Sequence, residues 1–435
     1  MASLLTFMTF LLVGLCTVQA VVLTLRPAVS PIYPVDLHQV RLRDHVRHVR
    51  IFEHFIGGWV NITMSYDVVF ENIGMYFTKL ELGSPPREFE VLFDTGSDLS
   101  WVACSSCADC PRSSGLRIPI NFYDITSSQT AKLVSCSRHK CNGLGATCSK
   151  TNQCNYHVKY GDGDEVDGYY VSDVIHFDML TSQFNSSEFI VFGCTENMSG
   201  LLTTNNLAFS GIVGFGPGQL SVISQLSSRA STPKVFSHCL RGDRGAGGVL
   251  ALGEVIEPRI IYTPLIGSRH YNVELESISV DGKVLPVDRK TFRDVLVDSG
   301  TTLAYLPEVA LTAFITAVNI AIPKSVTTGI GAGRQIYEVP SFISMANAFP
   351  PVSLTFPGGV SMLLKPQEYL LNTSFFNGVT TWEIAFQKSQ GPVTIFGDII
   401  LKDKIIEYDL ARQRLRWPTR DCTFMNLHEL LRLRD

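Results

Sequence analysis

Residues 91–97 read VLFDTGS, and residues 295–301 read VLVDSGT. In both copies three apolar residues, typical of a buried strand, run into an Asp, a hydroxyl residue, a Gly and a second hydroxyl residue. Each copy is followed further along the chain by two apolar residues and a glycine, at 212–214 (IVG) and at 395–397 (IFG). Because this composite pattern occurs once in each half, the sequence predicts a duplicated lobe in which each copy forms one strand and one tight turn.

The sequence around the two copies is typical of a mainly β protein. Short stretches rich in Val, Ile, Phe, Tyr and Leu alternate with Gly, Pro, Asn and Asp clusters, and we expect strands at 89–93, 249–252 and 271–280. A helix is predicted over 308–322, because Pro307 suits a first turn and Pro323 cannot continue a helix. Shorter helices are expected at 221–228 and at 427–433.

Composition excludes several classes of partner. The chain has 435 residues, of which 45% are apolar and 17% charged, with a formal net charge of −4. It is too apolar for a disordered protein, and it offers no basic surface for nucleic acid or an anionic membrane. No uninterrupted apolar stretch approaches the about 18 residues that a spanning helix needs, so no transmembrane anchor is expected.

The N-terminus and the cysteines indicate the secretory pathway. Residues 1–20 are predicted to be a signal peptide, because the apolar run 4–16 ends at Val18-Gln19-Ala20, which suits signal peptidase. Ten cysteines then enter an oxidising compartment, where disulfides are the expected state. These disulfide candidates are Cys104, Cys107, Cys110, Cys136, Cys141, Cys148, Cys154, Cys194, Cys239 and Cys422. Four sequons fit the same route as glycosylation candidates: Asn61, Asn185, Asn197 and Asn372.

Asp94 and Asp298 are the candidate catalytic pair. If the two lobes pack about a pseudo-twofold axis, these carboxyl groups meet, and two carboxylates a few ångströms apart share one proton. The charged carboxylate can then take a proton from a bound water while its partner donates one to a substrate carbonyl, which hydrolyses a peptide bond without a covalent intermediate. No metal and no cofactor is expected. The residues that support the pair are Thr95, Gly96, Ser97, Ser299, Gly300 and Thr301.

With these two motifs the chain resembles the pepsin-like aspartic proteases. The resemblance implies a bilobal β fold with short helices, an N-terminal lobe over 66–245 and a C-terminal lobe over 246–435. It also implies two substrate-binding elements: Trp101, seven residues after the first Asp, and a flap hairpin containing Tyr160 and Gly161. The cysteine-rich insertion between Trp101 and Tyr160 is most similar to that of the nucellin-like, or atypical, aspartic proteases of plants.

Two departures from that family pattern stand out. A cysteine pair usual in the second lobe aligns with Ile336 and Glu383, which suggests one lost bridge. Losing a native disulfide costs about 2 to 5 kcal/mol, so the departure bears on lobe stability more than on chemistry. Asp164 stands where the flap usually has a small hydroxyl residue, and it adds negative charge near the cleft.

Residues 21–65 are predicted to be an inhibitory prosegment. The segment is basic, with Arg41, Arg43, Arg47 and Arg50, and with His45 and His48 between them. Family resemblance implies that such a segment covers an acidic cleft at neutral pH and is released when acid protonates the carboxylates. The resulting enzyme is expected to be a monomer that cleaves protein or peptide substrates, best at acidic pH, outside the cell or in the vacuole.

Several alternatives remain beside this hypothesis. A catalytically silent binding or inhibitor protein on the same fold is the main one, although both Asp residues are retained. The Cys104-x-x-Cys107-x-x-Cys110 run is typical of metal clusters as well as of disulfides. His238 beside Cys239 suggests a thiol nucleophile, but a disulfide-bonded cysteine cannot serve as one.

Overall fold

The structure is a computed structural model of the chain. It describes residues 21–27 and 76–418, apart from 116–117, 137–140, 142–145, 160–164, 178–185, 206–207, 230, 243–247, 254–259, 268 and 332–333. Several predicted features lie outside the described residues: the signal peptide, the prosegment beyond residue 27, the flap residues Tyr160, Gly161 and Asp164, the sequons at Asn61 and Asn185, Cys422, and the helix at 427–433.

One large sheet runs through both halves of the described chain. Its strands, in spatial order, are β13 (Ile260–Pro264), β28 (Arg414–Pro418), β27 (Ile405–Asp409), β11 (Val235–Leu240), β12 (Gly248–Leu252), β1 (Val21–Pro27), β2 (Tyr76–Leu82), β3 (Arg87–Asp94), β10 (Gly211–Gly214), β4 (Trp101–Ala103), β9 (Ser186–Met198), β8 (Glu165–Phe177), β7 (Cys154–Lys159) and β6 (Thr147–Cys148), while β5 (Lys132–Leu133) pairs with β8. Because β11 pairs with β27, this sheet joins the end of the first half to the end of the second.

Three smaller sheets belong to the described part of the second half. The first contains β14 (Asn272–Val273), β17 (Val295–Val297), β26 (Thr394–Phe396), β18 (Ala304–Leu306) and β25 (Phe386–Lys388). The second contains β16 (Lys283–Val284), β15 (Ser277–Val280), β21 (Val352–Phe356) and β22 (Val360–Leu364). The third contains β19 (Thr327–Gly331), β20 (Arg334–Pro340), β24 (Val379–Ile384) and β23 (Leu370–Phe376).

Helices are short and few among the described residues. They are α2 (Val222–Ser228), α3 (Glu308–Ala321), α4 (Met345–Ala348) and α5 (Asp398–Leu401), with 3-10 turns at Ile125–Ser127, Gly200–Thr203, Arg289–Phe292 and Pro366–Glu368. The predicted helices at 221–228 and 308–322 are confirmed. Pro307 is the N-cap of α3, and the helix buries Ala310, Phe314 and Val318 on one face, as amphipathic spacing requires.

The predicted strand over 271–280 is wrong as a single element. It is split into β14 and β15, because the residues between them leave one sheet for another. The Leu275 amide donates to the Phe292 carbonyl at 3.1 Å, and the Glu276 amide donates to the Thr355 carbonyl at 2.7 Å. The alternating pattern therefore does not show where the chain passes between two sheets, since buried and half-buried residues alternate in both strands.

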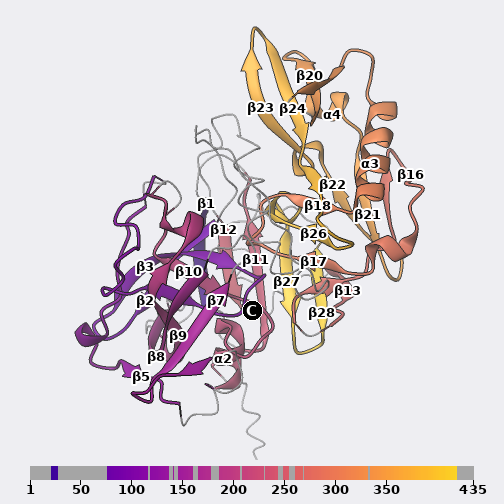
Figure 1. Cartoon of the computed structure of the whole chain (residues 1–435). Helices are drawn as coiled ribbons and strands as arrows, with labels where there is room; N and C mark the ends of the chain where they lie inside the picture. Colours follow the sequence, from indigo (N-terminus) through magenta and orange to yellow (C-terminus); the bar gives the residue numbers. More distant parts are fainter. Residues whose placement is uncertain are drawn as a thin grey trace, which may run out of the picture.

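Figure 1 shows the two lobes of the mainly β fold that the sequence predicts. Strands of the first half, in indigo to magenta, form one lobe, and the sheet of β20, β23 and β24 with α3 lies at the far end of the other. β11 and β27 lie between them, and β1 is inserted in the same sheet between β12 and β2. Among the described residues, no helix is both long enough and apolar enough to cross a membrane.

Candidate active site

Each Asp loop follows a buried strand that lies parallel to a second strand from the same half. β3 ends at Asp94 and lies beside β10, where Gly214 is the register partner of Asp94. β17 ends just before Asp298 and lies beside β26, and the Asp298 amide donates to the Phe396 carbonyl at 3.0 Å. The two halves therefore present their Asp residues in the same way, at the carboxyl end of a parallel strand pair.

Reciprocal hydrogen bonds between Thr95 and Ser299 join the two loops. The Thr95 amide donates to Ser299 Oγ at 3.0 Å, and the Ser299 amide donates to Thr95 Oγ1 at 2.9 Å. Each hydroxyl also donates to a carbonyl of the opposite half, Thr95 to Val297 at 3.4 Å and Ser299 to Phe93 at 3.3 Å. These four residues are buried, so little water competes and the bonds fix one loop relative to the other.

The Asp94 carboxyl group is held by its own loop. The Gly96 amide donates to Oδ1 at 2.9 Å, and the Ser97 hydroxyl donates to Oδ2. Asp94 is only 1% exposed, so these bonds replace much of the hydration that a carboxylate loses on burial. One main-chain and one hydroxyl donor thus orient the group, as expected for the Asp, hydroxyl, Gly, hydroxyl pattern.

The Asp298 carboxyl group has the same pair of donors and reaches the first loop. The Gly300 amide donates to Oδ1 at 2.8 Å and the Thr301 hydroxyl to Oδ2 at 2.6 Å, and Asp298 is 2% exposed. A Cβ added to Gly96 would come closer than 3.0 Å to the carboxyl carbon and both carboxyl oxygens of Asp298. Gly96 is therefore required because the second carboxyl group lies against the backbone of the first loop.

Two further polar residues brace the first loop and were missed by sequence reasoning. Asp98 Oδ1 accepts the Gly218 amide at 2.7 Å, and Ser100 Oγ accepts the Gly214 amide at 3.0 Å. Both tie residues after Asp94 to the other strand of the pair, Ser100 to the last residue of β10 and Asp98 to the chain that follows it. Their signal in the sequence is slight, because short polar residues beside a Gly turn are typical of ordinary loops.

Trp101, expected to contact substrate, lies in the core of the first half. It is 1% exposed, its register partner in β10 is Ile212, and its ring centroid lies 6.2 Å from that of Phe209. The other flap candidates, Tyr160 and Gly161, lie outside the described residues. A substrate-binding role for these three residues stays a prediction.

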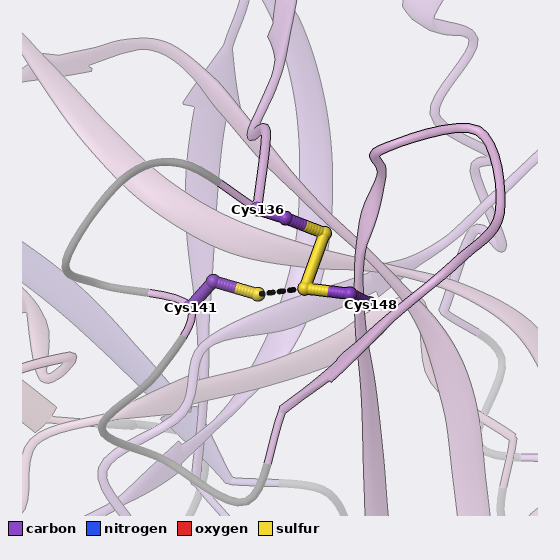
Figure 2. A group of neighbouring side chains, drawn as sticks. All are labelled: Cys136, Cys141 and Cys148. Carbon is purple, nitrogen blue, oxygen red and sulfur yellow. Dashed lines mark hydrogen bonds between the residues drawn. A yellow bond between two sulfur atoms is a disulfide. The ribbon is translucent and has the colours of Figure 1, made fainter.

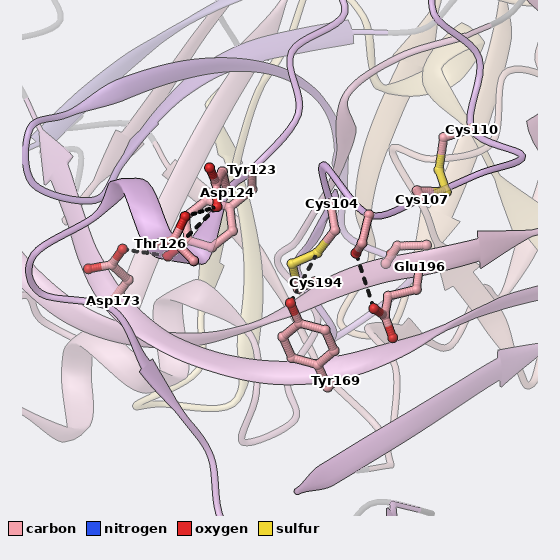
Figure 3. Close-up of a disulfide and its surroundings, with 12 residues drawn as sticks. Cys104, Cys107, Cys110, Tyr123, Asp124, Thr126, Tyr169, Asp173, Cys194 and Glu196 are labelled. Carbon is pink, nitrogen blue, oxygen red and sulfur yellow. Dashed lines mark hydrogen bonds between the residues drawn. A yellow bond between two sulfur atoms is a disulfide. The ribbon is translucent and has the colours of Figure 1, made fainter.

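Four disulfides join eight of the ten candidate cysteines to one another within the described chain. Cys104 is bonded to Cys194, which links β4 to β9, and Cys107 is bonded to Cys110 (Figure 3). The remaining two bridges join Cys136 to Cys148 and Cys141 to Cys154. Cys239 is also disulfide-bonded. The Cys104-x-x-Cys107-x-x-Cys110 run thus supplies two bridges and not a cluster of free thiolates for a metal.

Figure 2 shows three sulfur atoms gathered in the cysteine-rich insertion. The sulfurs of Cys136, Cys141 and Cys148 lie within 4.8 Å of one another, a spacing that suits a metal ion. Each belongs to one of two neighbouring disulfides, and a bridged sulfur is not the thiolate that a metal binds. The cluster is therefore covalent and structural.

The positions of the missing cysteine pair face each other across two strands. Ile336 on β20 is the register partner of Glu383 on β24, as two bridged cysteines would be. The Glu383 side chain is 7% exposed, and its Oε2 forms an ion pair with Arg334 Nε at 3.0 Å. An ion pair thus occupies the region where the family pattern has a covalent link.

The two sequons inside the described chain differ in exposure. Asn197 is exposed near the end of β9, whereas Asn372 on β23 is half-buried. Asn197 is therefore the more accessible acceptor, and glycosylation of either residue stays a prediction.

Comparison with known proteins agrees with this geometry. The family models Xylanase inhibitor N-terminal and Xylanase inhibitor C-terminal match residues 76–254 and 270–418. Aspartic proteinase 36 of Arabidopsis thaliana is 34% identical over 404 residues, which cover 89% of this chain and 81% of that protein. Aspartic proteinase nepenthesin-2 of Nepenthes gracilis is 28% identical over 373 residues, covering 81% of this chain and 79% of that protein.

A solved structure shares the fold across nearly the whole chain. The crystal structure of basic 7S globulin from soybean superposes with a TM-score of 0.66 at 15% identity, and covers 93% of this chain and 96% of the globulin. At this identity the likeness concerns the fold alone, whereas the proteinase relatives extend it to activity. The chain therefore belongs to the pepsin-like aspartic proteases of plants, and it is an aspartic-type endopeptidase.

Proposed function

We propose that Asp94 and Asp298 are the catalytic dyad and that they activate a water molecule between them. The observation that carries this proposal is the crossed pair of hydrogen bonds between Thr95 and Ser299, which fixes two matched Asp loops against each other. The Asp298 carboxyl group lies against Gly96, two residues from Asp94. Two carboxyl groups so close together share one proton, and so one is an acid while the other is a base.

Hydrolysis then follows from this division of roles. The ionised carboxylate takes a proton from water as the water oxygen bonds to the peptide carbonyl carbon, and the protonated carboxyl gives its proton to the carbonyl oxygen. The carboxyl group that took the water proton then gives it to the amine nitrogen as the carbon–nitrogen bond of the tetrahedral intermediate breaks, and the other carboxylate takes back a hydroxyl proton from the intermediate, which restores the starting state. Because one carboxyl must be protonated, acidic pH favours the reaction.

The test is to digest casein or haemoglobin from pH 3 to 7, with and without pepstatin, using wild-type protein and the variants Asp94→Asn and Asp298→Asn. We expect pepstatin-sensitive cleavage by the wild type and none by either variant. Asp281→Asn is the matched control, because Asp281 is exposed at a positive φ of 50°, which Asn also tolerates. Full activity of either dyad variant would overturn the assignment.

The alternative function is that of a protein that binds without cleaving, and the same experiment tests it. The matching family models are described as those of xylanase inhibitors, which is the observation that favours it. Wild-type protein with no cleavage at any pH, in a preparation whose prosegment has been removed, would support that alternative over the dyad mechanism.

Secretion and activation belong to the same proposal. The bridge between Cys104 and Cys194 supports passage through an oxidising compartment, and extracellular or vacuolar delivery follows from the predicted signal peptide. The start of the proposed prosegment, β1, is held in the large sheet by five register pairs with β12, which anchors that segment to the body of the enzyme. Flap closure by Tyr160 over the substrate completes the proposed cycle.

Activation can be tested on the secreted precursor. Precursor incubated at pH 4 should acquire a new N-terminus between Val21 and Tyr76 together with activity, whereas precursor kept at pH 7 should do neither. A precursor that is fully active at pH 7 with no processing would show that residues 21–65 do not inhibit.

A further inference from the structure

The longest edge strand in the described part of the chain is β23. It ends the sheet of β19, β20, β24 and β23, where β24 is its partner on one side. Its 7 residues exceed the length of every other strand at the end of a described sheet, since those strands have 2 to 5 residues. In Figure 1, β23 lies on the outer side of β24, at the far end of the second lobe. Along its other side, β23 offers main-chain N–H and C=O groups with which no strand of the described chain pairs.

The amino-acid composition of β23 does not protect this edge. Many proteins place Lys or Pro on an edge strand, which prevents a second chain from pairing with it. β23 reads LLNTSFF, and the chain has no charged residue between Glu368 and Glu383. Phe375 and Phe376 are 61% and 74% exposed. Uncharged segments of this length, rich in apolar residues and without Pro, are typical of strands that self-associate.

A glycosylation sequon lies at the centre of this strand. It consists of Asn372, Thr373 and Ser374. The register between β23 and β24 shifts between Asn372 and Ser374, so Thr373 is the extra residue of a β-bulge. Two apolar residues precede the sequon in β23 and two follow it. A chain that paired with the whole edge would therefore have to pass the side chain of Asn372.

The orientation of Asn372 leaves an exit for a sugar. The residue is half-buried, and its Oδ1 is buried without a hydrogen-bond partner in the described structure. The oxygen and nitrogen of a carboxamide diverge from the same carbon, so an inward Oδ1 directs Nδ2 outward. Nδ2 is the atom to which an N-linked glycan is attached. Because such glycans are added before the chain has folded, half-burial of Asn372 in the folded protein does not prevent their attachment.

We propose that an N-linked glycan on Asn372 covers the edge of β23 and prevents a second copy of this chain from pairing with it. A glycan is bulky and strongly hydrated, so at the centre of the strand it excludes a pairing chain from both ends of the edge. Without the glycan, β23 of one copy would pair with β23 of another about a twofold axis, which extends the sheet across both molecules. This inference rests on the proposed secretory route, where N-glycans are added, and not on the proposed dyad.

The experiment expresses the full chain in plant cells as wild type and as the variants Asn372→Gln and Ser374→Ala, each of which removes the sequon. Peptide mass spectrometry with and without peptide-N-glycosidase measures occupancy at Asn372, and sedimentation velocity measures association. We expect wild type to carry the glycan and to remain monomeric. Both variants should form dimers, whose share rises between about 1 and 100 µM protein, as expected for a small interface. Because the two variants change different side chains, a shared result traces association to loss of the glycan.

Two further variants are the matched controls. Asn197→Gln removes the sequon on β9, which lies between β4 and β8 in the large sheet and is not an edge strand. This variant should remain monomeric. Asn372→Lys removes the glycan but places a charge on the edge of β23, and it should also remain monomeric, because a Lys on an edge strand opposes pairing.

The outcomes separate this inference from the proposals on which it does and does not depend. A glycan at Asn197 but none at Asn372, or Asn372→Gln and Ser374→Ala that stay monomeric at every concentration, would overturn the inference while the secretory route stands. Equal association of Asn372→Lys and Asn372→Gln would also overturn it, because the contact would then not be the edge of β23. A chain retained in the cytosol with no glycan at any sequon would overturn the secretory route and this inference with it. None of these measurements depends on peptidase activity, so they are separate from the test of the dyad.

Discussion

The two halves build the same Asp loop but stabilise its surroundings with different chemistry. The first half contains four disulfides between Cys104 and Cys194. The second half has no cysteine from residue 246 to 418, and uses buried ion pairs instead. These pairs are Arg334 with Glu383, Lys404 with Glu368, and Arg416 with Glu407, whose Glu side chains are 7%, 3% and 0% exposed.

This difference separates the part of the duplicated lobe that both halves share from the part in which they differ. The buried strand, the Asp turn and the crossed hydrogen bonds recur in both halves, whereas the outer support does not. Disulfides are indifferent to acid, but ion pairs need ionised carboxylates. Acid is therefore expected to weaken the ion pairs that support the second half, and reductant to break the bridges that support the first half.

Asp409 illustrates the acid sensitivity of the second half. Burial by itself would raise the pKa of Asp409, but hydrogen bonds from Arg412 and Arg414 outweigh it and leave the pKa below its ordinary value of 3.8. Ionised Asp409 therefore adds stability above pH 3.8, and this contribution is lost as pH falls through the lowered pKa.

The largest expected effect concerns the shared core of the two halves. Gly96→Ala places a methyl group against the Asp298 carboxyl group, so the loops must separate or rotate. A displacement of this size at the proposed catalytic pair should lower kcat/KM by about 100-fold or more. Gly329→Ala is the control, because its methyl group would make only ordinary contacts, 3.5 Å from Ile336. Peptidase assays that find Gly96→Ala as active as this control would contradict the close approach of the two loops.

The next effect concerns the sheet that both halves share. Burial lowers the pKa of His238 from 6.5 to about 3, so between these values the unfolded chain takes up a proton that the folded protein does not. The free energy of unfolding should therefore fall as pH falls from 6.5 to 3, by on the order of 5 kcal/mol in total. Urea unfolding at pH 7, 5 and 4 measures this slope, and His238→Gln should make it shallower by about 1.4 kcal/mol per pH unit. If wild type and His238→Gln show the same dependence of the unfolding free energy on pH, burial does not lower the pKa of His238.

A third prediction concerns the covalent support of the first half. Replacing Cys104 and Cys194 by Ala opens a link across 90 residues, and the chain-entropy model gives a loss of about 4 to 5 kcal/mol in the free energy of unfolding. Replacing Cys107 and Cys110, only 3 residues apart, should cost about 2 kcal/mol. Denaturant unfolding of both variants at pH 5 compares them. A larger loss for the short bridge would mean that loop closure does not govern their contribution.

The Asp loops were predictable because every feature that builds them is local. Apolar strand, Asp, hydroxyl and Gly stand side by side in the sequence, and α3 is marked by Pro307 and Pro323 at its two ends. The pairing of Cys104 with Cys194 was not predictable, because ten cysteines allow many pairings and none is marked by local pattern.

What the sequence could not reveal depends on contacts between distant residues. His238 and Tyr408 are 170 residues apart, and nothing near either one indicates that β11 and β27 are neighbours. The split of 271–280 into two strands has the same origin, since it depends on β17 and β21 as partners. Patterns of three to seven residues therefore identify the chemistry, while tertiary pairing decides what holds it in place.

The smallest expected effect concerns the part of the second half where the family's usual disulfide is absent. Glu383→Gln removes the charge that faces Arg334, whose side chain is 22% exposed and can still reach water. The expected loss is therefore about 1 to 2 kcal/mol, less than for a fully buried pair. Glu308→Gln is the control, because Glu308 and Lys388 are 70% and 57% exposed and such surface pairs contribute under about 1 kcal/mol. In thermal unfolding at pH 7, Glu383→Gln should have a lower melting temperature than this control. If the two variants have the same melting temperature, the ion pair does not replace the missing bridge, and the second half relies on apolar packing around Ile336 instead.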